Sequence, residues 1–448
     1  MLKPYREFLK SHPAFGRILT NSGWLFFDRI VRMGGALVIG IWMARYLGPE
    51  SYGSLNFVLA IIALVGSIAN LGMDSIIVRD LLADQKNREE IIGTSFGLQL
   101  IAGIFGYAIS IFVIYYLRPN SPQIELMTWI LGFSLVVRCW SVIKYWFEAQ
   151  VYSKHIVLVE NIIFLASGAA KITAILYDLG IFYLVVILFI ENIATTVGYF
   201  LLYKLNHGRL SVWSGKWYRA KSILRDCWQL LLSNIAILIY MRMDQIMIGQ
   251  MLDDRAVGIY TSAVRISEVW YFIPLIIVSS VYPSIIKAKE QNTDSYYEQL
   301  RTLHIVLLFL SLAIAILLSF LADPLIKFLY GLSYSEAGAI LSIHIWTSVF
   351  VFLGIASGRW FILENLQRFQ LYQSLAGCSA NLVLNYLLIP KYGILGAAVS
   401  TLISQALAST FFNVLNERSR FAFIMQIEAF LFWRSSLIKN FFSLSRPQ

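Results

Sequence analysis

The chain has 448 residues, of which 58% are hydrophobic and only 14% are charged. Soluble globular proteins carry about 25% charged residues and roughly 45–50% apolar ones, so this composition excludes a set of soluble domains. The mean hydropathy of +0.67 agrees with this. The formal net charge of +10 does not indicate a nucleic-acid partner, because the basic residues form no stripe on a soluble domain. We therefore expect a protein that crosses a membrane many times.

Twelve stretches of the chain are long and apolar enough to cross a bilayer, which takes about 20 residues in a helix. Their apolar runs lack the alternation of a barrel strand, so the spans are expected to be α-helices. The stretches lie near 21–45, 52–78, 91–117, 124–147, 156–177, 181–203, 227–251, 257–282, 301–321, 339–362, 366–389 and 394–415. The sequence thus predicts an all-α polytopic membrane protein with about 12 transmembrane helices.

The basic residues predict the orientation of these spans. If the N-terminus lies in the cytoplasm, the inside segments hold 24 Lys and Arg residues and the outside loops hold 5. Cytoplasmic loops of membrane proteins carry such an excess. An even number of spans then places both termini in the cytoplasm, and the basic loops are expected to contact membrane lipids with anionic headgroups.

A weak internal repeat divides the chain in two. Residues 44–53 and 251–260 each place a Leu, an acidic turn and a Gly between two long spans. The copies are 205 residues apart and share one orientation, as in transporters built from two parallel repeats. We expect two pseudo-symmetric six-helix lobes at 1–205 and 227–415, a cytoplasmic interfacial linker at 206–226 and a cytoplasmic interfacial tail at 416–448.

Two segments outside the spans are predicted to lie in the membrane interface. Residues 210–225 mix Trp and Tyr with Lys and Arg, which is typical of an interfacial helix. Residues 421–440 are interrupted by Glu428, Arg434 and Lys439, so they are interpreted as interfacial and not as a further span.

Ionisable side chains inside spans are costly and usually face a cavity or a partner. Arg138 has no acidic residue within one turn of its span, and Arg242 lies two residues from Asp244. That spacing is ~200° of helical rotation, so Arg242 and Asp244 cannot share a helix face. Arg138 and Arg242 are therefore the strongest candidates to line a path. Because arginine suits phosphate and carboxylate geometry, the path is expected to carry an anionic lipid headgroup.

The remaining charged groups allow a second interpretation. Asp28 and Arg32 are four residues apart, and Arg265 and Glu268 are three apart, so each pair could neutralise itself on one helix face. Lys144 lies close to a cytoplasmic end, where snorkelling to the interface is the favoured account. The candidate path cations are Arg32, Arg138, Arg242 and Arg265, and the candidate ion-coupling or partner acidic residues are Asp28, Glu191, Asp244 and Glu268.

Motifs of enzyme chemistry do not occur in the sequence. There is no Walker motif, no HExxH and no GxSxG. The five histidines are scattered, and the three cysteines lie in or beside spans with no metal-binding spacing. We therefore expect no catalytic residues, no metal and no cofactor.

Six short stretches carry a family resemblance. They are ARYLGPESYG at 44–53, YMRMDQIMIGQML at 240–252, VGIY at 257–260, EVWYFIP at 268–274, ENLQRFQLY at 364–372 and NLVLNYLLIPKYGILGA at 381–397. Together they resemble the bacterial polysaccharide flippases (Wzx-type) of the multidrug/oligosaccharidyl-lipid/polysaccharide exporter superfamily.

The resemblance implies two six-helix lobes around a central cavity, and alternating access. It also implies a substrate, an undecaprenyl-diphosphate-linked oligosaccharide repeat unit moved from the inner to the outer leaflet of the bacterial cytoplasmic membrane. The products would be surface polysaccharides such as O-antigen, with polysaccharide polymerase and export proteins as partners. Cavity cations would bind the diphosphate, and an ion gradient would supply the drive.

Other interpretations stay open at this point. A multidrug exporter of the same fold would need an acidic cavity for cationic drugs, whereas the central spans here hold arginines. A flippase for peptidoglycan precursors would share the anionic substrate. A membrane glycosyltransferase or polymerase would be expected to place acidic residues on a sizeable outside loop, and a scaffold protein has little reason to keep arginines in its spans.

Overall fold

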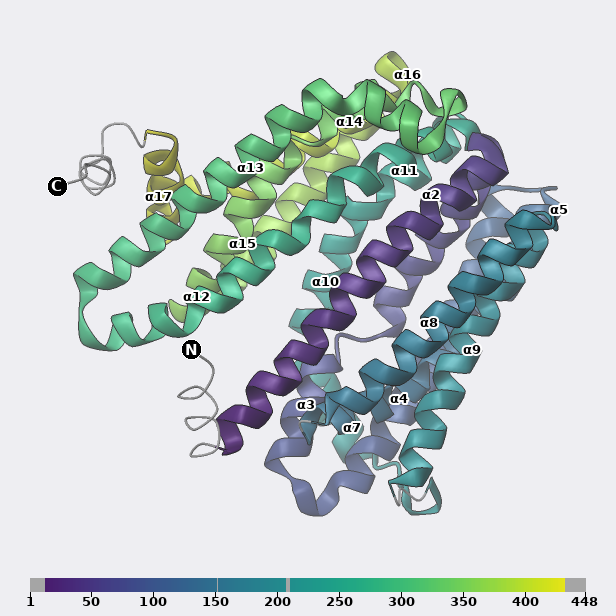
Figure 1. Cartoon of the computed structure of the whole chain (residues 1–448). Helices are drawn as coiled ribbons and strands as arrows, with labels where there is room; N and C mark the ends of the chain where they lie inside the picture. Colours follow the sequence, from purple (N-terminus) through teal and green to yellow (C-terminus); the bar gives the residue numbers. More distant parts are fainter. Residues whose placement is uncertain (1–12, 151, 207–209, 432–448) are drawn as a thin grey trace, which may run out of the picture. The chain divides into compact units, whose positions relative to one another are not determined.

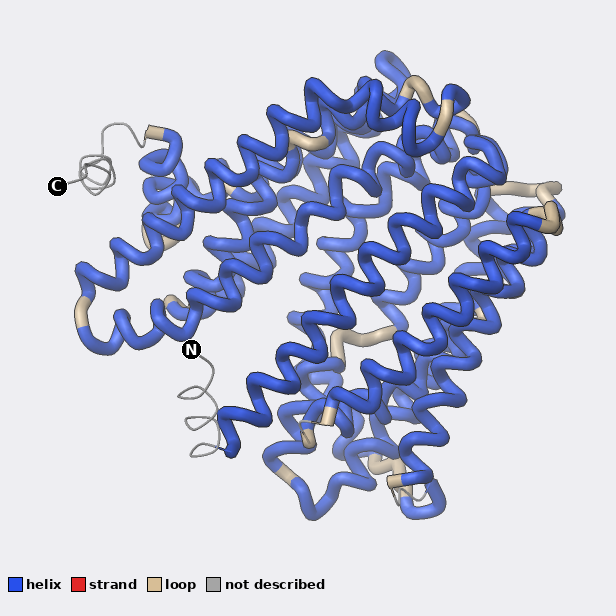
Figure 2. Tube along the Cα trace, viewed as in Figure 1, coloured by secondary structure: helices blue, strands red, loops and turns tan. Residues whose placement is uncertain are grey.

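The computed structural model describes residues 13–150, 152–206 and 210–431, with side chains from residue 31 onward apart from residue 367. All regular secondary structure in these ranges is helical, and no strand occurs in them (Figure 2). Apolar segments of this length favour helices because a helix satisfies its backbone donors and acceptors internally within a bilayer. The all-α class predicted from the sequence is confirmed.

The chain folds into two compact units, Met1–Leu238 and Ile239–Gln448. The long helix α10 (Trp217–Met251) begins in the first unit and ends in the second (Figure 1). The first unit also contains α2 (Pro13–Ala69), α3 (Asp74–Ala83), η1 (Gln85–Asn87), α4 (Arg88–Leu117), α5 (Pro122–Gly132), α6 (Ser134–Val137), η2 (Arg138–Ser141), α7 (Val142–Ala149), α8 (Ser153–Leu176), α9 (Ile181–Leu205) and η3 (Leu210–Val212). The second unit contains α11 (Asp254–Glu268), η4 (Val269–Tyr271), α12 (Phe272–Gln291), α13 (Thr293–Tyr330), η5 (Leu332–Tyr334), α14 (Ala337–His344), α15 (Thr347–Leu363), α16 (Gln367–Ser409), η6 (Phe411–Leu415) and α17 (Arg420–Phe430).

Ten stretches in the described ranges are long and apolar enough to cross a membrane. The two longest each contain a break at a glycine, which is Gly48 in α2 with φ 71° and Gly393 in α16 with φ 58°. Glycine adopts positive φ without the steric cost that a Cβ imposes. Dividing both stretches at these glycines gives twelve segments, the number of spans expected from the sequence.

The internal repeat corresponds to two turns at equivalent positions. The first copy breaks at Gly48, and the second turns at Asp253, the N-cap of α11. The Asp253 carboxylate accepts a hydrogen bond from the Ala256 amide at 2.7 Å. These two turn residues are separated by the same 205 positions as the sequence repeat. One copy turns through a left-handed glycine and the other through a capped helix start.

Part of the segment expected to form the linker belongs to a long helix. Within 206–226, η3 is followed by α10, which starts at Trp217 and continues to Met251. Ile223 is buried in the core of the first unit, whereas Trp217 is 82% exposed. The start of α10 thus has one face packed on the first unit and another face that remains open. The lobe boundaries and the interfacial role of this segment stay predictions.

Ion pairs attach the start of α10 to the first unit. Arg219 places Nη2 2.9 Å from Asp84 Oδ2 and Nε 3.0 Å from Glu90 Oε1. Hydrogen bonds from Asn87 and Arg219 hold the pKa of Asp84 below its ordinary value. Charge therefore supplements burial in fixing this end of α10 to the neighbouring ends of α3 and α4.

Helix α17, the last helix in the described ranges, packs against α13 in the second unit. Arg301 Nε lies 2.9 Å from Glu428 Oε2, and the buried Gln426 side chain donates a hydrogen bond to Ser357 Oγ at 2.9 Å. The described part of the predicted tail is therefore a helix with one buried face. Residues 432–448 lie outside the described ranges, and the interfacial interpretation of 421–440 stays a prediction.

In the first unit, helix α8 packs against both α2 and α9 (Figure 1). Gly168 of α8 lies against Ile39 of α2, because a Cβ at this glycine would approach Ile39 Cδ1 to 2.8 Å. Small residues allow membrane helices to approach closely. This packing brings side chains of α2, α8 and α9 within contact distance of one another.

Candidate functional site

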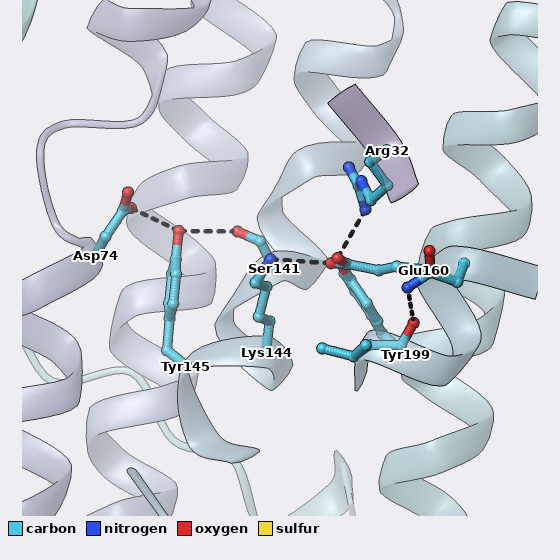
Figure 3. Close-up of polar contacts among 9 residues, drawn as sticks. Arg32, Asp74, Ser141, Lys144, Tyr145, Glu160 and Tyr199 are labelled. Atoms are coloured by element: carbon cyan, nitrogen blue, oxygen red, sulfur yellow. Dashed lines mark hydrogen bonds and ion pairs between the residues drawn. The ribbon is translucent and has the colours of Figure 1, made fainter. Parts of the chain in front are cut away.

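A buried carboxylate in the first unit contacts two cations from other helices (Figure 3). Glu160 of α8 accepts a hydrogen bond from Arg32 of α2, with Nη1 2.7 Å from Oε2. Lys144 of α7 places Nζ 2.9 Å from Oε1, and the Tyr199 hydroxyl of α9 donates to the same oxygen. We call these four residues the Glu160 cluster. It joins four helices through one side chain.

The two cations of the cluster are partly exposed, whereas the carboxylate is buried. The Glu160 side chain is only 5% exposed, whereas Arg32 is 44% exposed and Lys144 is 33% exposed. The carboxylate therefore lies behind the two cations. Charged groups held in this way inside a membrane protein usually mark a substrate or ion pathway.

The position of the cluster follows from the helix lengths. Glu160 lies seven residues after the start of α8, and Tyr199 lies six residues before the end of α9. At 1.5 Å per residue, each is about 10 Å from its helix end. These two ends lie on the side of the membrane expected to be cytoplasmic, so the cluster is expected in the cytoplasmic half of its lobe.

A second hydrogen-bond network fixes α7, the helix that carries Lys144 (Figure 3). The adjacent residue, Tyr145, donates its hydroxyl to Asp74 Oδ1 at 2.6 Å. The Ser141 hydroxyl lies 3.4 Å from the Tyr145 hydroxyl and 3.3 Å from Gln99 Oε1. Helix α7 has only eight residues and follows a 3-10 segment, so these contacts help to orient Lys144 toward Glu160.

A closed ion pair lies farther along α8. Lys171 is 6% exposed, and its Nζ lies 2.6 Å from Glu191 Oε2 of α9. Ser167 donates a hydrogen bond to the same oxygen at 2.6 Å. Lys171 is eleven residues beyond Glu160, which is about 16 Å along the helix. Here one cation faces one carboxylate, so Glu191 is already neutralised by Lys171.

In the second unit, Asp244 of α10 is buried and only 3% exposed. Its carboxylate accepts hydrogen bonds at 2.6 Å from both the Tyr260 hydroxyl and Asn385 Nδ2. Thr401 donates to the same group. In the described ranges no ion pair engages Asp244, so its charge is met only by neutral donors. Asn385 Oδ1 and Asn381 Nδ2 are buried beside it with no hydrogen-bond partner among the described residues.

Arg242 points to a different neighbour from Asp244. Its Nη2 lies 3.7 Å from Glu268 Oε2 of α11. Arg265 lies on α11 three residues before Glu268 and is half-buried. Arg242 and Asp244 therefore have different partners, but Glu268 and Tyr260 both belong to α11. That the two side chains lie on different faces of α10 stays a prediction from their spacing.

Arg138 lies in the 3-10 segment η2 and is exposed. Its guanidinium lies beside α2, because a Cβ at Gly66 would be 3.4 Å from Arg138 Nη1. Asp28 belongs to α2, but its side chain lies outside the part of the chain whose side chains the structure describes. The roles of both residues in a substrate path stay predictions.

The interpretation of Lys144 as a snorkelling lysine is wrong, because its ammonium group pairs with the buried Glu160. Sequence reasoning also missed Glu160 and Asn385. Glu160 is a carboxylate near the start of the fifth apolar stretch, and that signal could have singled it out. The role of Asn385 could not be found from spacing, because Asp244 lies 141 residues away in the sequence.

Comparisons with known proteins agree with the architecture. A family model described as polysaccharide biosynthesis protein matches residues 42–339. The probable flippase AglR of Haloferax volcanii is 27% identical over 218 residues, which cover 48% of this chain and 45% of AglR. The match thus spans less than half the length of that relative.

Two solved structures share the fold over nearly the whole chain. The lipid II flippase MurJ, in an inward closed conformation, aligns with a TM-score of 0.71 and 14% identity, covering 96% of this chain and 94% of MurJ. An inward-facing multidrug resistance MATE family transporter of the MOP superfamily aligns with a TM-score of 0.68 and 16% identity, covering 93% of this chain and 99% of the transporter. At these identities the likeness concerns the fold alone.

Proposed function

Because the chain belongs to the polysaccharide biosynthesis protein family, we propose that it is a flippase for lipid-linked oligosaccharide. It moves undecaprenyl-diphosphate-linked repeat units from the inner to the outer leaflet of the bacterial cytoplasmic membrane by alternating access, without catalysing a reaction. Both termini face the cytoplasm, and a polysaccharide polymerase and export proteins act on the product. The likeness to the probable flippase AglR supports this proposal.

The observation that carries the proposal is the pair of cations on Glu160. Arg32 and Lys144 are both partly exposed within an apolar lobe, where an isolated charge is costly. Cations in such a place favour an anionic substrate group, and guanidinium forks match phosphate oxygens. Arg32 and Arg138 in the first lobe, with Arg242 and Arg265 in the second, form the proposed anion path.

Asp244 is the proposed ion-coupling residue. A buried carboxylate that only neutral groups contact carries a desolvation penalty that a bound proton or small cation would relieve. The unsatisfied Asn385 Oδ1 beside it adds a further acceptor. Glu268 and Glu191 are proposed as structural partners of Arg242 and Lys171, and Asp28 as a partner of the path cations.

The test follows the lipid-linked intermediate in a strain that lacks the protein. Lipids are extracted, and an impermeant sugar-modifying reagent applied to spheroplasts reports the leaflet that holds the intermediate. We expect completed repeat units trapped on the cytoplasmic leaflet. If they reach the outer leaflet normally but stay unpolymerised or incomplete, flipping is rejected and an enzyme of polysaccharide assembly is favoured.

The likeness in fold to the MATE transporter makes a small-molecule exporter the second candidate. Such a protein would protect cells from cationic drugs. The pair of cations around Glu160 argues against a cationic cargo. Unchanged drug susceptibility in the deletion strain, together with trapped intermediate, would separate the two functions.

A further inference from the structure

We propose that Glu160 is an exchangeable counter-anion. Its carboxylate holds Arg32 and Lys144 close together, so that they form a binding site for two anionic oxygens. A phosphate group of the substrate replaces the carboxylate at this site. This inference rests on the proposed function and adds a specific residue to it. Glu160 would be a positioning residue, because it acts through the two cations and is not itself in contact with the substrate.

The geometry of the carboxylate supports the exchange. Its two oxygens are divided between the cations, with Arg32 on Oε2 and Lys144 on Oε1. The diphosphate of the substrate presents several oxygens in a comparable arrangement and carries one negative charge on each of its two phosphates, against one on the carboxylate. A diphosphate could therefore contact both Arg32 and Lys144 in place of the carboxylate.

The exposed fractions support a route for the incoming group. Glu160 is almost fully buried, while a third or more of each cationic side chain is exposed. An anion can therefore approach Arg32 and Lys144 from the side opposite Glu160. The Tyr199 hydroxyl, which donates to Glu160, would keep the displaced carboxylate hydrogen-bonded.

Two further carboxylates lie near the cluster. Asp74 accepts hydrogen bonds from Asn70 and Tyr145 at 2.9 and 2.6 Å, so its contacts point away from the cations. Glu148 lies one turn after Lys144 on α7 and adds negative charge to the same region. Both lower the attraction of the site for an anion, whereas Glu160 contacts Arg32 and Lys144 directly. Removing the charge of Glu160 should therefore have the largest effect.

A purely structural role for Glu160 predicts the opposite sign. If the carboxylate only ties α2, α7, α8 and α9 together, its loss loosens the cations and weakens anion binding. If it competes with the substrate, its loss removes a negative charge beside Arg32 and Lys144 and strengthens binding. The variant Glu160→Gln separates these roles, because the amide keeps the size of the side chain and an acceptor oxygen.

The experiment measures binding of farnesyl diphosphate to the purified full chain in nanodiscs, with farnesol as the uncharged control. We expect Glu160→Gln to bind the diphosphate about tenfold more tightly than the wild type and Lys144→Gln to bind it about tenfold more weakly. A tenfold change in affinity is at the lower end of the coupling energies measured for close charge pairs. Binding of farnesol should not change.

The second unit offers a matched pair for control variants. Lys289 lies 2.9 Å from Glu364, and these side chains are 37% and 31% exposed. Lys289→Gln and Glu364→Gln should leave farnesyl diphosphate binding within about twofold of the wild type, since they lie outside the proposed site.

Equal or weaker binding by Glu160→Gln would overturn the inference. If that variant does not fold, the comparison of Lys144→Gln with Lys289→Gln decides, and equal affinities overturn it. Flipping is not required for the binding assay. If the protein flips its substrate but the variants do not change diphosphate binding as expected, only the inference about Glu160 is rejected. If the variants change binding as expected but the protein does not flip its substrate, only the proposed function is rejected.

Discussion

Arg242 and Asp244 lie two residues apart on α10 and pair with different side chains, although both contact α11. Arg242 faces Glu268 of α11 at 3.7 Å, while Asp244 accepts a hydrogen bond from Asn385 of α16 at 2.6 Å. The same helix segment therefore carries one cation in a long, weak ion pair and one carboxylate with no cationic partner in the described ranges. This arrangement is the basis of the two proposed roles, in which Arg242 contacts the anionic substrate and Asp244 binds the coupling ion.

Replacing Arg242 with Ala should abolish polysaccharide export and leave the protein inserted in the membrane. Arg242→Lys should restore only part of the activity, because a lysine retains the charge but loses the guanidinium fork. Surface polysaccharide on gels and the amount of protein in the membrane fraction measure the two effects. The control is Arg255→Ala, since Arg255 is an exposed arginine that pairs with Glu336 at 2.8 Å. Normal polysaccharide in the Arg242→Ala strain would reject a role in the substrate path.

Replacing Asp244 with Asn should remove the dependence of transport on an ion gradient. The amide preserves the size of the side chain but cannot neutralise a cation or exchange a proton, so we expect flipping to fall at least about tenfold. Flipping by reconstituted protein is measured with imposed sodium and proton gradients. Asp253→Asn is the matched control, because Asn caps a helix as well as Asp does. Undiminished stimulation by both gradients in Asp244→Asn would exclude coupling at this residue.

The ease of prediction differs among these residues for physical reasons. Long apolar runs are a local signal, so the spans and the all-α class follow from the sequence. The expectation that Arg242 and Asp244 point in different directions from α10 also follows from the sequence, because it needs only their spacing and the geometry of a helix. The partners of Arg32 and Asp244 do not, because Glu160 and Asn385 lie 128 and 141 residues away in the sequence. The snorkelling interpretation of Lys144 fails for a related reason, since only the packing of α7 against α8 reveals its buried partner.

The break in α2 should depend on glycine at position 48. Gly48 has φ 71° and ψ 168°, a conformation that costs other residues about 1–3 kcal/mol. A Cβ at Gly48 would have no other atom within 4 Å, so Gly48→Ala should destabilise the protein through backbone strain and not through a clash. Gly97 also has open space around it but lies inside α4, where Ala is favoured by about 0.5–1 kcal/mol. Thermal unfolding in detergent should therefore show a lower midpoint for Gly48→Ala and an unchanged or higher one for Gly97→Ala. A stable Gly48→Ala variant would mean that this turn can adopt another conformation.

The proposed orientation can be tested with single cysteines. The native residues Cys139, Cys227 and Cys378 are all buried, so an impermeant thiol reagent should give little background. Glu336 is 53% exposed and lies after α13, in a loop expected outside, whereas the exposed Lys86 lies in a loop expected in the cytoplasm. Glu336→Cys should be labelled in intact spheroplasts, and Lys86→Cys only after permeabilisation. The reversed pattern would invert the topology, and it would place the Glu160 cluster near the outer leaflet. A flippase that collects its substrate from the cytoplasmic leaflet would then need a different first contact for the diphosphate.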